Sequence, residues 1–123
     1  MKTEITDDVI RAVLDHLADE ALENSKAWLP GWHEDLPMPL SVGYALGFGG
    51  EAGEVLNKVK KVYRDRKQPG AEQRLEDVAE EMGDALTYWL LLMKEMDLDV
   101  LTAYRRKVAF NDGRFGRHGE HVV

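Results

Sequence analysis

Two pairs of acidic residues have the spacing of metal ligands on neighbouring helices. Glu51 and Glu54 form one acid-x-x-acid pair, and Glu81 and Asp84 form a second. Three residues turn a helix by about 300°, so both acids of a pair lie on one face, about one turn apart. Two such helices packed antiparallel would gather four carboxylates, whose mutual repulsion a cation can relieve. Hard oxygen ligands on a rigid scaffold suit Mg²⁺, with Mn²⁺ as an alternative.

Acidic pairs are also common on solvated helix faces, and the position of the second pair argues against that simpler interpretation. Asp77, Glu81 and Asp84 share a stripe that continues into Tyr88 and Leu91. A purely solvated stripe would lie opposite the apolar face of its helix, whereas this one leads directly into an apolar segment. The pattern favours a site at the edge of the core.

Glycine is unusually frequent around the first acidic pair. The glycines of this segment are Gly43, Gly47, Gly49, Gly50 and Gly53. Each glycine inside a helix costs roughly 0.8–1 kcal/mol relative to alanine. We therefore expect a neighbouring helix or a ligand to approach the backbone closely here. The alternative is that residues 47–50 interrupt the helix.

Two lysines follow the first acidic pair on the same helix face. Lys58 and Lys61 lie one and two turns beyond Glu51 and Glu54. Acids followed by lysines along one stripe could hold a metal ion and then a polyphosphate. The alternative is a set of i, i+4 ion pairs, each worth about 0.2–0.5 kcal/mol.

Hydrophobic periodicity predicts one all-α domain over residues 1–123, with a core at about 6–110 and an extended or mobile tail at about 111–123. Three prolines within ten residues, at 30, 37 and 39, predict a loop after the first helix. The expected architecture is a four-helix bundle with short connections. The predicted helices cover residues 6–27, 41–66, 71–96 and, from a start near 97–99, residues up to 110.

The third predicted helix implies self-association. Residues 85–93 are apolar on nearly every side, and such a helix must be covered from several directions. Four short helices of one chain are unlikely to suffice, so we expect a homo-oligomer.

Composition excludes several classes of function. The formal net charge is −7, whereas proteins that bind nucleic acid polymers typically have a basic surface, so we expect no such partner. The absence of cysteine excludes disulfides, zinc–thiolate sites and thiol nucleophiles. No apolar run is long enough for a membrane span or a signal peptide, so we expect a cytoplasmic protein without a membrane partner. None of the four histidines follows a glutamate by three positions, which argues against a di-iron carboxylate bundle.

These motifs together resemble the MazG-like nucleoside triphosphate pyrophosphohydrolases. That family has E-x-x-E on one helix and E-x-x-D on the next, and residues 46–55, 58–65 and 80–89 resemble its pattern. The segment with Lys107, Asn111 and Arg114 is similar to the basic stretch that closes the family's domain. Two positions depart from the pattern. Gly50 stands where some members carry a further acid, and Asn111 stands where arginine is frequent.

The resemblance implies an all-α, MazG-like fold that assembles as a homodimer or a homotetramer. It implies hydrolysis of a nucleoside or deoxynucleoside triphosphate to a monophosphate and pyrophosphate, with Mg²⁺ as cofactor. Water would attack the α-phosphorus. Glu51, Glu54, Glu81 and Asp84 would be the metal ligands.

Further roles follow from the same resemblance and from residue chemistry. The general base would be Glu80, Asp77 or a metal ligand such as Glu81. A tryptophan at the start of the proline-rich segment, Trp28, could stack on the base of the substrate or simply cover a helix end. The candidates for contacts with the phosphates are Lys58, Lys61, Lys107 and Arg114.

Two alternative interpretations remain open from the sequence. One is a related activity of the same superfamily, an all-α dUTPase or a phosphoribosyl-ATP pyrophosphatase, which would share the metal site and differ in the nucleoside pocket. The other is a non-enzymatic helical interaction module whose acidic stripes are solvated or bind a basic partner.

Overall fold

The computed structural model describes residues 4–116, and these residues are all-helical, as the sequence predicts. The first element is α1, Asp7–Trp28. Its N-terminus is capped by Thr6, whose hydroxyl oxygen accepts a hydrogen bond from the backbone N–H of Val9 at 3.2 Å. Such a cap satisfies one of the free N–H groups of the first turn. The predicted start of this helix is therefore confirmed.

The proline-rich segment is not a plain loop, and that prediction was wrong in part. A short helix, α2, spans Pro30–Glu34 directly after α1. Pro30 is at its first position, where a fixed φ is already helical and no N–H is required. The loop proper is limited to the residues between Glu34 and the next helix, which contain Pro37 and Pro39.

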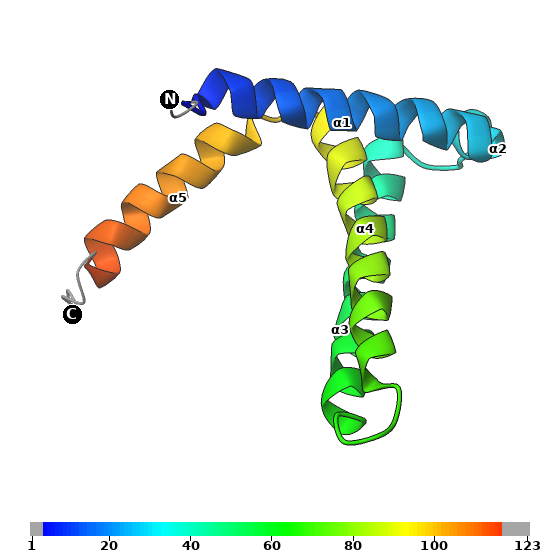
Figure 1. The fold of residues 1–123 in the computed structure, drawn as a ribbon. Helices are drawn as coiled ribbons and strands as arrows, with labels where there is room; N and C mark the ends of the chain where they lie inside the picture. Colours follow the sequence, from blue (N-terminus) through cyan, green and yellow to red (C-terminus); the bar gives the residue numbers. More distant parts are fainter. Residues whose placement is uncertain (1–3, 117–123) are drawn as a thin grey trace.

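Helices α3, Leu40–Arg64, and α4, Ala71–Glu95, form an antiparallel hairpin (Figure 1). The helix α3 begins one residue before the predicted start at residue 41, and Pro39 occupies the cap position without a side-chain hydrogen bond. In the connection, Asp65 pairs with Arg64 at 2.7 Å and with Arg74 at 3.1 Å. The pair between Asp65 and Arg74 joins the end of α3 to the first turn of α4.

The glycines of α3 do not interrupt the helix, so the alternative of a break at residues 47–50 is wrong. Two of them allow the close approach that the sequence predicts. A Cβ at Gly47 would lie 2.6 Å from the ring of Tyr88 on α4, and one at Gly43 would lie 2.6 Å from Leu36. Gly49, Gly50 and Gly53 have nothing within 4 Å of the same position among the described residues.

Helix α1 crosses one end of the hairpin, and the core lies at this crossing (Figure 1). Ala18 of α1 is buried against Leu90 and Met93 of α4. Half-buried side chains around these three complete the cluster: Leu14, Ala21, Trp89 and Val100. The crossing therefore fixes the position of α1 relative to the C-terminal half of α4.

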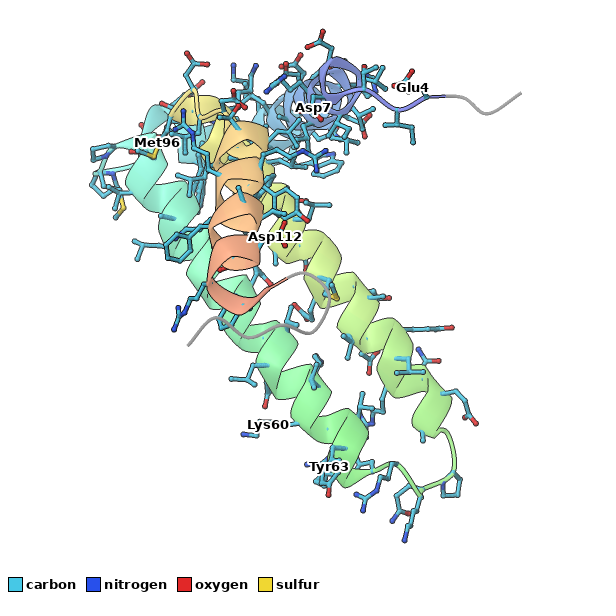
Figure 2. All side chains as sticks on the ribbon, turned by 90° about the vertical axis from the view of Figure 1, so that its left-hand side faces the viewer. Glu4, Asp7, Lys60, Tyr63, Met96 and Asp112 are labelled. Atoms are coloured by element: carbon cyan, nitrogen blue, oxygen red, sulfur yellow. The ribbon has the colours of Figure 1, made fainter. Side chains whose placement is uncertain are left out.

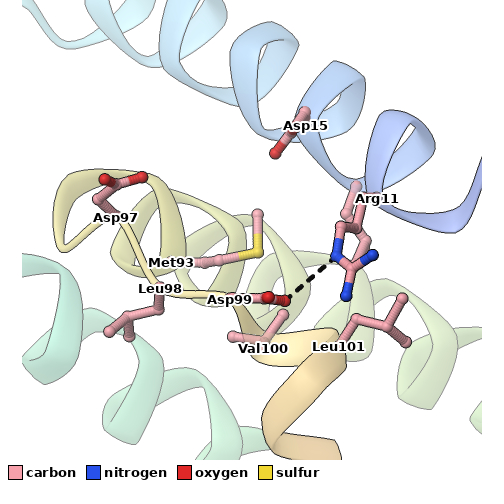
Figure 3. Close-up of a pocket in the computed structure, with 9 residues that line it drawn as sticks. Arg11, Asp15, Met93, Asp97, Leu98, Asp99, Val100 and Leu101 are labelled. Atoms are coloured by element: carbon pink, nitrogen blue, oxygen red, sulfur yellow. Dashed lines mark hydrogen bonds and ion pairs between the residues drawn. The ribbon is translucent and has the colours of Figure 1, made fainter. Parts of the chain in front are cut away.

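The last helix, α5, spans Val100–Phe115 and extends away from the hairpin (Figure 1). Arg11 of α1 contacts the first turn of α5. Its Nε lies 3.4 Å from Asp99, and its Nη2 lies 3.0 Å from the hydroxyl oxygen of Thr102. Figure 3 shows the Arg11–Asp99 contact beside a cavity of about 350 Å³ at this junction. A second ion pair, Arg105 with Asp7 at 3.0 Å, also joins α5 to α1.

The predicted end of this helix at residue 110 was wrong. Residues 111–115 are helical rather than extended, and the chain leaves the helix at Gly116, where φ is +72°. The Asn111-Asp112-Gly113 sequence resembles a turn, but a glycine inside an exposed helix costs only about 1 kcal/mol. The rest of the predicted tail, residues 117–123, lies outside the described residues.

The four long helices do not close into a bundle within one chain. Figures 1 and 2 both show the far end of the hairpin, which carries Lys60 and Tyr63, with neither α1 nor α5 beside it. Large apolar side chains are exposed along the hairpin, among them Leu46 at 63%, Leu56 at 63% and Leu75 at 61%. Within residues 4–116, no helix combines the length and the apolarity needed to cross a membrane.

Candidate metal centre and adjoining cavity

The antiparallel packing of α3 and α4 brings the two acidic motifs together. Glu51 of α3 and Glu81 and Asp84 of α4 each offer a carboxylate oxygen, and these three atoms lie within 4.8 Å of one another. Glu51 and Glu81 are half-buried and Asp84 is exposed. Three of the four predicted metal ligands therefore form one group, which we call the acidic cluster.

Glu54 is outside this tight group but acts on it electrostatically. Its side chain is exposed on the next turn of α3, and its charge contributes to raising the pKa of Glu51. The larger causes of that raised pKa are partial burial, a side-chain hydrogen bond with Glu81 and the charge of Asp84. The raised pKa means that the Glu51 carboxyl gives up its proton less readily than a solvated glutamate does.

The negative charge of the acidic cluster is not balanced by basic side chains. Within residues 4–116, none of Glu51, Glu54, Glu81 and Asp84 makes an ion pair with lysine or arginine. Carboxylate oxygens without a basic partner are the donor set that a hard divalent cation prefers. The residues present therefore fit Mg²⁺ or Mn²⁺.

An aromatic group supports the cluster from one side. The ring of Tyr88, one turn after Asp84, packs on the α3 backbone at Gly47. Burial, then the charges of Glu51 and Asp84, raise the pKa of the Tyr88 hydroxyl. Trp32 of α2 contacts the Tyr88 ring, with the ring centroids 5.8 Å apart. Residues of α2, α3 and α4 therefore fix this wall of the site.

A cavity of about 460 Å³ adjoins the acidic cluster. Glu51 and Asp84 line it, together with Tyr88. The remaining wall of the cavity comes from α1, from Leu29 directly after it, and from the apolar part of α4. Trp28 also lines the cavity, and it is 73% exposed. The size of the cavity is in the range of small-molecule pockets in proteins. The structure thus places Trp28 against the same cavity as two of the predicted metal ligands.

Other predicted site residues are not brought to the cluster within one chain. Glu80 is exposed and is not part of the acidic cluster. Lys58 and Lys61 lie further along α3, and neither makes the predicted alternative ion pairs within the described residues. Lys107 and Arg114 are on α5, over the rings of Phe110 and Phe115 at 5.6 and 4.8 Å.

Except for Trp28, the residues that α1 contributes to the cavity could not be identified from the sequence. Glu20, Asn24 and Ser25 line it from α1, and Thr87 lines it from α4. Their polar character resembles that of any solvated helix face, so the sequence holds no signal that separates them. Tyr88 was the exception, because it continues the acidic stripe.

Comparisons with known proteins found a similar protein in a bacteriophage. The chain is 35% identical over 63 residues to the "Gene 37 protein" of Mycobacterium phage L5, a match that covers 51% of this chain and 55% of that protein. The chain therefore spans about half the length of the relative it matches. No family model and no solved structure matches the chain.

Proposed function

We propose that this protein is a Mg²⁺-dependent nucleoside triphosphate pyrophosphohydrolase of the MazG-like kind. The observation that carries the proposal is the acidic cluster of Glu51, Glu81 and Asp84, without basic partners among the described residues and beside a cavity of about 460 Å³. A cation site next to a cavity of that size suits a ligand with a charged end and a ring system. The all-α fold and the two acidic motifs support the same family.

The acidic residues of the cluster would hold the cation. Glu51, Glu81 and Asp84 supply the nearest oxygens, and Glu54 adds charge from the next turn. When bound, Mg²⁺ or Mn²⁺ neutralises phosphate charge and makes a water molecule more acidic. The protein's own contribution is to fix these oxygens on two rigid helices and to align the substrate.

Glu81 is the better placed of the two proposed catalytic residues. It belongs to the acidic cluster and is half-buried, whereas Glu80 is exposed outside the cluster. In the proposed reaction, water forms a bond to the α-phosphorus and the bond from that phosphorus to the bridging oxygen breaks. The proton of the water passes to Glu81 or, through solvent, to Glu80, and pyrophosphate leaves.

The proposal includes a homodimer or a homotetramer. Exposed apolar side chains along the hairpin, such as Leu46, Leu56 and Met82, need a cover that α1 and α5 do not give. Such patches commonly mark protein–protein contacts. The basic residues Lys107 and Arg114 would reach phosphates only in an assembly that brings α5 to a hairpin.

The test is release of pyrophosphate from a panel of NTPs and dNTPs, with and without Mg²⁺, with identification of both products. We expect a monophosphate and pyrophosphate, formed only with Mg²⁺. Glu81→Gln should abolish the activity, and Glu72→Gln, an exposed position on the same helix, should retain it. Full activity in Glu81→Gln would refute the site, and a product other than pyrophosphate would refute the reaction.

The related superfamily activities are outcomes of the same assay. Hydrolysis restricted to dUTP would indicate an all-α dUTPase, and hydrolysis restricted to phosphoribosyl-ATP would indicate that pyrophosphatase. If no nucleotide is cleaved and Mg²⁺ does not stabilise the fold, the interaction module becomes the better interpretation.

A further inference from the structure

The cavity beside the acidic cluster has one polar strip and otherwise apolar walls. Leucines and an alanine from α1 and α4 form most of its surface, including Leu17, Ala21, Leu90 and Leu91. The polar strip comes from α1, where Glu20 and Asn24 are spaced i, i+4 and so share a face. A flat ring can lie against the apolar wall while its edge meets this strip.

Most other polar groups of the cavity are already engaged. The hydroxyl of Ser25 is hydrogen-bonded to Nε2 of His33 at 3.0 Å. The hydroxyl of Thr87 donates to the backbone oxygen of Gly83 at 3.0 Å. Tyr88 lines the cavity beside Glu51 and Asp84, whose charges raise the pKa of its hydroxyl. It therefore belongs to the acidic end of the cavity. These groups are therefore poor candidates for hydrogen bonds to the polar atoms at the edge of a bound ring.

Glu20 and Asn24 retain their hydrogen-bonding capacity. Within the part of the chain that the structure describes, the Asn24 amide has no hydrogen-bond partner. The Glu20 carboxylate has one distant contact, 3.8 Å from Nε2 of His16. An ionised carboxylate only accepts hydrogen bonds, whereas an amide both donates and accepts.

We propose that this cavity binds the base of the nucleotide and that Glu20 and Asn24 select bases with an exocyclic amino group. The amino group of cytosine or adenine donates to the Glu20 carboxylate. The Asn24 amide donates to the ring nitrogen beside that group, which is an acceptor in both of these bases. Uracil and thymine present a carbonyl oxygen where cytosine has its amino group, and a carboxylate repels that oxygen. The inference rests on the proposed function, because it assigns the specificity of the same site.

The sharpest comparison is dCTP against dUTP, whose bases differ in the amino group against a carbonyl at C4 and in N3, an acceptor in cytosine and a donor in uracil. We expect the wild-type kcat/KM to favour dCTP about 5- to 150-fold, the range of 1–3 kcal/mol for one good polar contact to a base. Glu20→Gln should bring the ratio close to one, because an amide can also donate to the carbonyl of uracil. Glu23→Gln, an exposed residue of α1 that does not line the cavity, is the matched control and should keep the wild-type ratio.

Asn24→Ala provides a second variant on the same strip. It should raise KM for dCTP severalfold with kcat nearly unchanged, because the lost contact is made equally in the ground state and the transition state. The same comparison with dUTP should show a smaller change. A fall in kcat alone would mean that Asn24 has a different role.

Direct binding separates failure of this inference from failure of the proposed function. Calorimetry with dCMP and dUMP needs no turnover, and we expect tighter binding of dCMP to the wild type than to Glu20→Gln. If triphosphates are hydrolysed but dCTP and dUTP are equivalent, the base selection is wrong and the enzyme remains. If neither monophosphate binds, or both bind equally, the inference is overturned whatever the activity assay shows.

Discussion

Gly47 and Gly49 offer a paired test of how the hairpin is packed. Both glycines lie inside α3, so replacement by alanine gains the same helix propensity at each, roughly 0.8–1 kcal/mol. Their surroundings differ. The added methyl group of Gly47→Ala would lie 2.6 Å from the Tyr88 ring, and that of Gly49→Ala meets nothing within 4 Å among the described residues.

The expected free energies follow from this difference. Gly49→Ala should stabilise the protein by up to about 1 kcal/mol. Gly47→Ala gains the same propensity but must displace a half-buried ring that Trp32 also contacts, and overpacking of this kind costs about 1–3 kcal/mol. The net effect at Gly47 should range from neutral to about 2 kcal/mol of destabilisation, with the two variants about 1–3 kcal/mol apart.

Urea unfolding followed by circular dichroism measures the difference, at one protein concentration because self-association would add to apparent stability. In a thermal melt the separation corresponds to roughly 3–5 °C per kcal/mol for a chain of this size. Since Tyr88 lines the cavity, Gly47→Ala should also lower pyrophosphohydrolase activity, and Gly49→Ala should not. Equal stabilisation by both substitutions would refute the close packing of Tyr88 on α3.

Three further outcomes are expected. Because the pKa of Glu51 is raised in the folded protein, the metal-free protein should lose stability as pH rises above about 4.3, the ordinary glutamate value. Bound Mg²⁺ should oppose this loss. Melting temperatures measured across pH in EDTA and in Mg²⁺ test the prediction, and parallel curves would contradict it. Thr6→Ala should cost about 0.5–2 kcal/mol in urea unfolding, with Thr6→Ser close to the wild type, whereas equal losses would argue against the cap. Lys94→Met should leave the stability in the same assay close to that of the wild type, because the ion pair with Asp19 is exposed, and a clear loss would show a hidden structural role.

The acidic cluster could be predicted from sequence because helical register is local. Spacing alone places Glu51 beside Glu54 and Glu81 beside Asp84, and an antiparallel hairpin follows from the short connection between their helices. The axial offset of the two helices is not local, since it depends on where side chains such as Tyr88 interlock with Gly47. That offset brings Glu51 to both acids of α4 and leaves Glu54 one turn beyond them.

The cavity could not be predicted, because it depends on where α1 crosses α4. The crossing is fixed by Ala18 meeting Leu90 and Met93, a contact between residues more than seventy positions apart. Helical periodicity marks the apolar face of α1 but not the point of contact on α4. Glu20 and Asn24 therefore look like solvated positions until that crossing is known.

The same limit explains the errors at the helix ends. Pro30 was taken as a helix breaker, although proline is well suited to the first position of a new helix. The glycine-rich segment from residue 111 was expected to leave the helix, although a single glycine such as Gly113 is tolerated inside one. In both cases, residues with strong local preferences had two compatible conformations, and their neighbours decided between them.

The order of side chains along α4 gives the strongest link between the fold and the proposed chemistry. Asp84 is exposed, Tyr88 is half-buried one turn later, and Leu91 is buried at the next turn beneath α1. A single helix face thus passes from charged to aromatic to aliphatic within two turns, and residues of all three kinds line one cavity. A ligand that matches this order carries its charge at one end and a flat, weakly polar ring at the other, which is the arrangement of a nucleotide. An acidic stripe that was merely solvated would have no reason to continue into a cavity that α1 also lines.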